Sequence, residues 1–380
     1  MVLGRAQESC SGHGRPTEAI VDLDRIGHNV TYLKSFLATG VALMAVVKAD
    51  AYGHGALRVS KAALDAGAEW LGVALAEEAV ELREAGIAAP ILILGPSHDR
   101  QMDWAVRHGV DLTVFDDQHL LWAKMAAKRH RTRARIHLKL DTGMGRVGLI
   151  SDRLSEAWIE ALADPDLHWI GLSTHFSASD TDPGATKTQL ARFLDAIEYL
   201  RGQGALPSEI HAANSAAIMQ YPGAHFTMVR AGIAVYGLKP YSQAAGLAPA
   251  LKWRSEVAYI KVVGQDFAVG YAGTFRTAEA MQLLSVPVGY ADGYRRGWSN
   301  VSDVLIGGHR YPVAGRVSMD QITVAVPLGI AVRVGDPVVL LGRDGEEEIS
   351  AEELAGHIDS ISYEVVTGIG KRVPRRYRGD

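Results

Sequence analysis

The feature that most constrains this chain is an alternation that begins near residue 41 and runs to about residue 237. Short apolar, β-branched runs are separated there by segments whose apolar residues recur at helical spacing, such as AEEAVELREAG and TKTQLARFLDAIEYLRGQG. The runs are LMAVVKA, WLGVAL, PILILG, DLTVFD, RIHLKLD, WIGLSTH, EIHAANS and MVRAGIAVYG. Eight such β/α units predict an α/β fold, an eight-stranded (β/α) TIM-type barrel. A doubly wound open sheet also alternates, but it has no reason to stop at eight and usually carries a Gly-rich turn after its first strand.

The hydrophobic pattern of the sequence changes after roughly Leu247. Helical spacing is no longer found there, and short predicted strands follow one another through Gly and Asp turns. A chain of 380 residues is long enough for one large domain and a smaller one. We therefore expect a disordered N-terminal tail over residues 1–16, a barrel over 17–247 and a mainly β C-terminal domain over 248–380. The run EAIVDLDRI precedes the eight barrel strands, so the strand near residues 18–24 could instead join the β domain.

Composition excludes several classes of function. The formal net charge is −4, and the one basic run, KRVPRRYRG, is short, so a nucleic-acid partner is not expected. The opening residues lack the apolar core of a signal peptide, and no segment has about 18 uninterrupted apolar residues, so neither export nor membrane insertion is expected. The single cysteine, Cys10, excludes an intramolecular disulfide framework and favours a reducing compartment, with the cytoplasm as the default.

Polar side chains collect where the predicted strands end, which is the face on which barrel enzymes carry their active sites. They are Lys48, Lys139 with Asp141, His175, Asn214 with Ser215, and Arg230. Each has an ordinary structural interpretation: a lysine extending to solvent, a hydrogen-bonded core histidine, or half of an ion pair. Together they predict an electropositive mouth that suits an anionic ligand.

A lysine in such a low-dielectric mouth has a lowered pKa and attacks carbonyls, which indicates a Schiff base. Both an aldolase and a pyridoxal phosphate enzyme use one. The stretch HAANSAA and the close-approach Gly232 in RAGIAVYG favour a phosphate cradle, although either stretch could be a helix cap.

The motifs AVVKADAYGHG, HLKLDTGMGRVG, STHFSASD, HAANSAA, MVRAGIAVYGL, GYADGY, GRVSMDQ and YEVV follow one another at fitting intervals from about residue 17 to the C-terminus. In this order they resemble those of the alanine racemases, bacterial enzymes that use pyridoxal 5'-phosphate and have a β/α barrel followed by a β domain. The resemblance implies interconversion of L-alanine and D-alanine, which supplies D-alanine for cell-wall peptidoglycan or degrades it. No metal site is implied.

The resemblance also assigns roles to residues. Lys48 would bind the cofactor as a Schiff base and act as the base toward D-alanine, while Arg230 would face the pyridine nitrogen. Because arginine keeps its proton, the ring would accept less electron density, and racemisation would prevail over transamination. The residues implied for cofactor binding, chiefly around the phosphate, are Tyr52, Asn214, Ser215, Gly232, Ile233 and Tyr363.

A second acid/base is needed on the opposite face of the substrate, since one group could only return the proton where it found it. Tyr271 in VGYAGTF matches this position, with His175 and Arg230 as the neighbouring positive network. The family places this tyrosine in the active site of the other subunit, which implies a homodimer with shared active sites. Without the resemblance, Tyr271 could be an ordinary strand aromatic.

Further matches concern the substrate and its path. Arg146 and Met319, with Asp320 beside it, correspond to groups near the substrate carboxylate. Lys139 corresponds to a lysine that is carbamylated in much of the family, or it could be an unmodified lysine on the strand. The narrow access corridor would comprise Asp180, Tyr290, Arg296, Arg316 and Ile361.

Two stretches, TGIGKRVPRRY after YEVV and DGYRRGW, depart from the family pattern near the corridor. They leave open a serine or broad-specificity racemase. Related decarboxylases need a C-terminal cysteine that this chain lacks. A non-catalytic pyridoxal phosphate carrier would resemble the barrel alone.

Overall fold

The computed structural model describes residues 14–379, which form two compact units that we treat separately. One unit comprises residues 22–250 with Arg378 and Gly379, and the other comprises the described residues up to Val21 and residues 251–377. Cys10 and most of the expected tail lie outside the described residues. Arg15, near the end of that expected tail, donates to both carboxylate oxygens of Asp292 at 2.7 and 2.6 Å. The chain is therefore anchored before residue 17.

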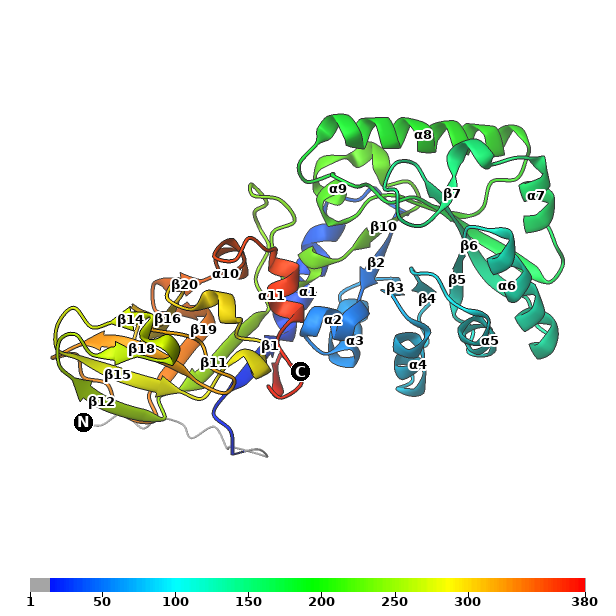
Figure 1. Ribbon diagram of the computed structural model, residues 1–380. Coiled ribbons are helices and arrows are strands. Elements are labelled where there is room, and N and C mark those ends of the chain that lie inside the picture. Colours follow the sequence, from blue (N-terminus) through cyan, green and yellow to red (C-terminus); the bar gives the residue numbers. More distant parts are fainter. Residues whose placement is uncertain (1–13, 380) are drawn as a thin grey trace. The chain divides into compact units, whose positions relative to one another are not determined.

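The unit containing residues 22–250 is the predicted eight-stranded parallel barrel (Figure 1). Around the ring the strands follow the order β2-β3-β4-β5-β6-β8-β9-β10, and pairing of β10 with β2 closes it. The strands are β2 (Ala42–Val46), β3 (Trp70–Val73), β4 (Ile91–Ile93), β5 (Asp111–Val114), β6 (Ala134–Asp141), β8 (Leu167–Ser173), β9 (Glu209–His211) and β10 (Met228–Ala231), with the short β7 (Leu149–Ile150) beside β6. They are buried on both faces, as strands of a parallel sheet covered by helices must be.

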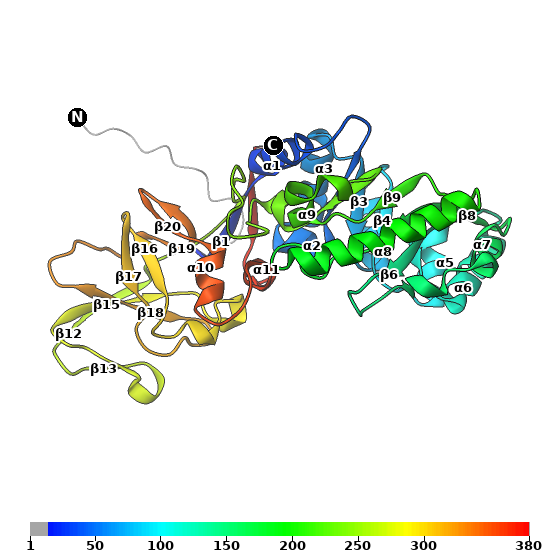
Figure 2. The same ribbon diagram turned by 90° about the horizontal axis from the view of Figure 1, so that it is seen from above.

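Helices connect successive strands and cover the outside of the barrel; in Figure 1 and Figure 2 the long α8 lies along its outer surface. The helices are α1 (Leu23–Lys34), α2 (Lys48–Gly53), α3 (Ala56–Asp65), α4 (Ala76–Glu84), α5 (Asp99–Arg107), α6 (Asp117–His130), α7 (Glu156–Leu162), α8 (Pro183–Gly202) and α9 (Ser215–Gln220). Aspartates begin three of them: Asp22, Asp116 and Asp182 each accept a backbone N–H of the first turn. None of the helices between residues 14 and 379 is both long and apolar enough to cross a membrane.

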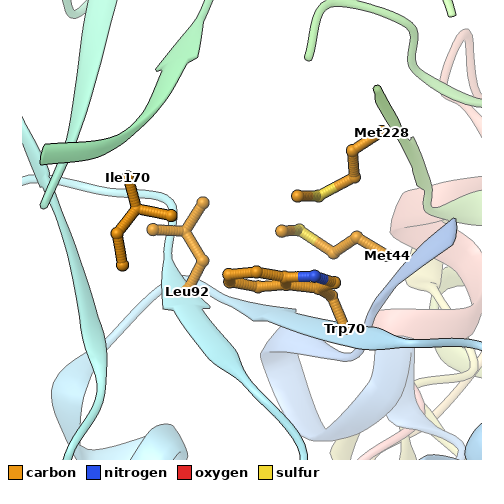
Figure 3. Packing of buried hydrophobic residues seen from close by; sticks show 5 residues of the cluster. All are labelled: Met44, Trp70, Leu92, Ile170 and Met228. Atoms are coloured by element: carbon orange, nitrogen blue, oxygen red, sulfur yellow. The ribbon is translucent and has the colours of Figure 1, made fainter. Parts of the chain in front are cut away.

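The interior of the barrel holds an apolar cluster contributed by five strands. Figure 3 shows Met228, Met44 and the Trp70 indole one above another, with Leu92 and Ile170 beside them. Side chains two residues apart on a strand share a face, so Met228 pointing inward also directs Arg230 inward. The barrel interior thus holds an apolar cluster at this level, and Arg230 lies nearer the C-terminal ends of the strands.

The other unit is mainly β. Its largest sheet has the order β17-β16-β19-β11-β1-β21, with β20 beside β19, and smaller sheets join β12-β15-β18 and β13-β14. The elements are β1 (Glu18–Asp22), β11 (Leu251–Glu256), β12 (Tyr259–Val263), β13 (Ala268–Val269), β14 (Phe275–Arg276), β15 (Met281–Val286), β16 (Asp303–Ile306), β17 (His309–Pro312), β18 (Ile322–Pro327), β19 (Pro337–Asp344), β20 (Glu347–Ile349), α10 (Ala351–Gly356), α11 (Ser362–Thr367) and β21 (Arg375–Arg378).

The first strand of the chain, β1, belongs to this sheet and pairs antiparallel with β11. Glu18 on β1 lies opposite Arg254 and accepts its Nη2 hydrogen bond at 2.6 Å. The extended run ends at Asp22 instead of continuing to about residue 24, because the Asp22 carboxylate accepts the Arg25 N–H and starts helix α1 at Leu23.

Candidate active site

Lys48 stands at the C-terminal end of β2 and begins an unusual turn. The next four residues, Ala49 to Tyr52, all have positive φ values between 51° and 53°. A left-handed turn of non-glycine residues costs roughly 1–2 kcal/mol per residue, so it persists only where its surroundings hold it. The strain therefore lies in the four residues that immediately follow the predicted reactive amine.

Two carboxylates hold this turn. Glu78 accepts the Ala49 N–H at 2.6 Å through Oε1, and its Oε2 accepts the N–H groups of Ala74 and Leu75 at 2.8 and 3.1 Å. Asp50 accepts the N–H of residue 56 at 2.7 Å. Sequence reasoning missed both; a Glu three residues after the start of a helical segment is a capping signal that could have indicated Glu78.

Neighbouring groups shift the pKa of the Lys48 amine in opposite directions. Its pKa lies below the usual lysine value, first because of burial and then because of the Arg146 guanidinium, while Glu78 opposes the shift. A larger fraction of the amine is therefore neutral near pH 7 than for a free lysine, which is the form that attacks a carbonyl.

Lys139 lies on β6 at the same mouth. Burial lowers its pKa to about 8, with further lowering from Arg230, Arg146 and Lys48 and an opposing effect of Asp141. Two lysines and two arginines thus influence one another within the barrel, as the electropositive mouth predicted from the sequence requires.

Arg230 on β10 is 6% exposed, and its Nη hydrogens are committed to the protein. Nη1 donates to Nδ1 and the carbonyl oxygen of His211 at 2.7 and 2.8 Å. Nη2 donates to the carbonyls of Thr174 and Ala212 at 2.6 and 3.0 Å and lies 3.2 Å from Nδ1 of His175. Among the described residues, none accepts from its Nε–H, so this donor is the one left for a bound group.

His175 follows β8. Its pKa lies well below the usual histidine value, because the ring is enclosed by protein and because Arg230, Lys139, Arg146 and Lys48 repel a further positive charge. The ring is therefore neutral at pH 7. Since arginine only donates, Nδ1 of His175 is the acceptor, and the ring proton lies on Nε2.

Ser215, Gly232 and Tyr52 meet on one side of the mouth. The Ser215 hydroxyl accepts the Gly232 N–H at 2.9 Å. A Cβ placed on Gly232 would lie 2.9 Å from the Tyr52 hydroxyl and 3.9 Å from the Ser215 hydroxyl, so the missing side chain leaves a small polar cradle. Asn214 caps helix α9 by accepting the N–H of residue 217. The helix-cap interpretation is therefore confirmed for Asn214, while the phosphate cradle stays a prediction.

The stretch DTGMGRVG folds around Asp141, the last residue of β6. Its Oδ1 accepts the N–H groups of Gly143, Met144 and Gly145 at 2.9, 2.9 and 3.1 Å. The loop carries Arg146, whose side chain is exposed and acts electrostatically on both lysines. Asp180, the remaining barrel residue of the predicted corridor, is exposed after β8.

The other predicted residues belong to the β-rich unit, where several are neighbours. The N–H of Tyr290 donates to the Ser318 carbonyl and the N–H of residue 291 to the Met319 carbonyl, both at 3.0 Å. A Cβ on Gly270 would lie 3.1 Å from the backbone nitrogen of Arg316, so the segment leading to Tyr271 runs beside the backbone of Arg316. The remaining members are Arg296, Asp320, Ile361 and Tyr363.

Tyr271 is 71% exposed and lies in a 3-10 turn (Tyr271–Gly273) rather than in a packed strand. Its interpretation as an ordinary strand aromatic is therefore wrong. Asp320 accepts from Arg372 at 2.8 Å, and Met319 and Ile361 are exposed.

Comparison with known proteins identifies the family of both units. The family profile "Alanine racemase, N-terminal domain" matches residues 21–240, and "Alanine racemase, C-terminal domain" matches residues 250–377. The alanine racemase of Symbiobacterium thermophilum is 46% identical over 371 residues, covering 96% of this chain and 98% of the relative. That of Carboxydothermus hydrogenoformans is 42% identical over 368 residues, covering 96% and 100%.

Solved structures give the same result. The alanine racemase of Bacillus anthracis with bound L-Ala-P has a TM-score of 0.90 at 39% identity and covers 97% of each chain. That of the D-cycloserine producer Streptomyces lavendulae has a TM-score of 0.91 at 38% identity, covering 97% and 98%. Sequence and fold agree, and the chain belongs to the alanine racemase family of isomerases.

Proposed function

We propose that the protein interconverts L-alanine and D-alanine with pyridoxal 5'-phosphate bound in the barrel mouth. The observation that carries the proposal is the combination of a lysine with lowered pKa, Lys48, and an inward arginine whose Nε–H has no acceptor among the described residues. D-alanine made in this way would supply peptidoglycan, or the enzyme would degrade it, in the cytoplasm.

The residues present fit this cofactor. Lys48 would hold it covalently through its amine, the cradle of Tyr52, Ser215 and Gly232 with the Ile233 backbone would accept its phosphate, and the Arg230 Nε–H would face its ring nitrogen. When bound, pyridoxal phosphate withdraws electron density from the substrate Cα and so acidifies the Cα proton. Arg230 keeps its own proton and limits this withdrawal, which favours return of the proton to Cα.

Racemisation then requires two proton-handling groups. Lys48 would act on D-alanine and Tyr271 on L-alanine, with neutral His175 and its Nε2–H beside Arg230 as the neighbouring network. Arg146, Met319 and Asp320 would lie near the substrate carboxylate, Asn214 and Tyr363 near the cofactor, and Asp180, Tyr290, Arg296, Arg316 and Ile361 along the access path.

The direct test is chiral analysis after incubation of the holoenzyme with single L-amino acids. L-alanine should be converted to an equal mixture of enantiomers, and Lys48→Ala should abolish the conversion. If L-serine or larger substrates are converted as fast as alanine, the broad-specificity alternative is correct. Cofactor binding without conversion of any amino acid would refute racemase activity and support the alternative of a non-catalytic pyridoxal phosphate carrier.

We further propose a homodimer in which Tyr271 serves the partner's site; its high exposure is compatible with such a role. Inactive Lys48→Ala and Tyr271→Ala proteins, mixed under subunit exchange, should form heterodimers with one intact site. Statistical mixing makes half the dimers mixed, so the bulk activity should reach roughly a quarter of wild type. Verified heterodimers without activity would place both residues in one chain.

A further inference from the structure

A line of buried polar groups runs through the barrel from Arg230 toward the opposite end of the strands. Arg230 Nη1 is 2.7 Å from Nδ1 of His211, Nε2 of His211 is 3.0 Å from Nδ1 of His137, and Nε2 of His137 is 3.3 Å from Oδ2 of Asp111. His211 ends β9, His137 lies in the middle of β6, and Asp111 is the first residue of β5. The line therefore connects the mouth with the N-terminal side of the barrel.

The positions of the protons along this line follow from Arg230, because a guanidinium can only donate hydrogen bonds. Arginine has no acceptor, so Nδ1 of His211 must accept and the His211 proton lies on Nε2. That proton is donated to Nδ1 of His137, which leaves the His137 proton on Nε2, facing Asp111. Both rings are consequently neutral, and every bond points from Arg230 to the carboxylate.

Asp111 terminates the line as an anion. It is 1% exposed; burial raises its pKa, but hydrogen bonds from His137 and Arg135 outweigh burial and hold the pKa below the usual range. Arg135 binds it through Nε and Nη2 at 2.6 and 3.1 Å. No described carboxylate is in hydrogen-bond or ion-pair contact with Arg230, so Asp111 is the carboxylate to which Arg230 is joined through hydrogen bonds.

The packing of the barrel interior fixes the His137 ring in this line. The His137 ring stands edge-on to the Trp70 indole, with ring centroids 5.6 Å apart, and Trp70 belongs to the apolar cluster of Figure 3. A Cβ on Gly171 would lie 1.9 Å from Nδ1 of His137, so only glycine at that position leaves space for the ring. The His137 ring therefore has one position, and its hydrogen bonds are directed by the packing.

We propose that Asp111 is a positioning residue: through His137 and His211 it holds Nδ1 of His211 as an acceptor, which fixes the guanidinium of Arg230 with its Nε–H toward the mouth. A change of tautomer at His211 would set an N–H against Nη1 of Arg230 at 2.7 Å, and the guanidinium would have to rotate. The consequence for the cofactor ring rests on the function proposed above; the proton arrangement does not.

The first test is nitrogen-15 NMR of histidine-labelled holoenzyme, with His137 and His211 assigned through His137→Gln and His211→Gln. Wild type should show both rings as neutral Nε2–H tautomers. An Nδ1–H tautomer or an imidazolium at either ring would overturn the proposal without any Asp111 variant.

The second test is Asp111→Asn, whose single acceptor oxygen cannot occupy both carboxylate positions; when that oxygen accepts from Nε of Arg135, the NH2 group faces Nε2 of His137. We expect the tautomer of His137, and with it that of His211, to change. The matched control is Asp103→Asn, since Asp103 also lies against an arginine and a histidine, Arg129 and His130, but on the outer helices. Unchanged tautomers in folded Asp111→Asn would refute the role of Asp111.

The link to Arg230 has its own measurement. Alanine and pyridoxal phosphate can also give pyruvate and pyridoxamine phosphate, with the amino group moving to the cofactor and a proton to its carbonyl carbon. A displaced or more acidic Arg230 should raise the ratio of this side reaction to racemisation several-fold in Asp111→Asn but not in Asp103→Asn. Altered tautomers with an unchanged ratio would overturn the positioning role, whereas a wild type that racemises nothing would refute only the proposed function.

Discussion

Replacing Glu78 by Gln tests how far one of the two carboxylates that hold the strained turn after Lys48 stabilises it. Glu78 accepts three backbone N–H groups, those of Ala49, Ala74 and Leu75. Glutamine has one acceptor oxygen, so either the Ala49 N–H or the other two lose their acceptor and face an NH2 group. A hydrogen bond to a charged acceptor contributes roughly 1.5–3 kcal/mol.

Each left-handed residue costs about 1–2 kcal/mol, so the backbone itself does not favour this turn. Losing the Glu78 hydrogen bonds should therefore directly increase how often the turn opens. A loss of about 2 kcal/mol corresponds to roughly 30-fold more frequent opening, at about 1.4 kcal/mol per factor of ten. Hydrogen exchange of a peptide covering residues 45–55 should therefore be roughly 30-fold faster in Glu78→Gln. Since Glu78 opposes the lowering of the Lys48 pKa, the pH midpoint for acylation of Lys48 in cofactor-free protein should also move down.

The matched control is Glu77→Gln. Glu77 lies in the same first turn of α4, but within residues 14–379 its carboxylate accepts only from the Gln101 side chain, at 3.2 and 3.3 Å. Exchange in residues 45–55 should be unchanged in this control. Equal exchange in Glu77→Gln and Glu78→Gln would refute the support of the turn by Glu78, and an upward shift of the Lys48 midpoint would refute the electrostatic argument.

Three further predictions follow from the mouth. Lys48→Ala should leave no borohydride-reducible bond between protein and cofactor; retention of that bond would show that another amine holds it. Tyr271→Ala should preserve exchange of the Cα proton of D-alanine with deuterium while exchange from L-alanine falls steeply, and an equal fall for both enantiomers would contradict the assignment of faces. Lys139, with a pKa of about 8, has a neutral fraction that rises from pH 7 to pH 9, and the neutral amine adds CO2 to give a carbamate and a proton. In carbon-13 NMR with labelled bicarbonate, a carbamate signal should grow over that range and be absent in Lys139→Met. If wild type gives no such signal, Lys139 is an unmodified lysine.

The fold class could be predicted because periodicity is a local property. Eight apolar runs separated by helical segments require eight parallel strands, and the ring β2 to β10 has them. The pairing of β1 was left open, because a strand's partner can lie far away in sequence; β11 follows β1 by more than two hundred residues. The end of β1 at Asp22 depends on a side-chain cap that a run of apolar letters does not reveal.

The sequence by itself determined the barrel, the β-rich unit and the set of polar side chains at the strand ends, because strand direction brings Lys48, Lys139, His175 and Arg230 to one mouth. Tertiary structure decided their chemical state. Burial and neighbouring cations set the two lysine pKa values, Glu78 holds a turn that local preference opposes, and His211 fixes the donors of Arg230. These effects depend on distances of about 3 Å between residues from different strands and helices, which no local pattern in the sequence specifies.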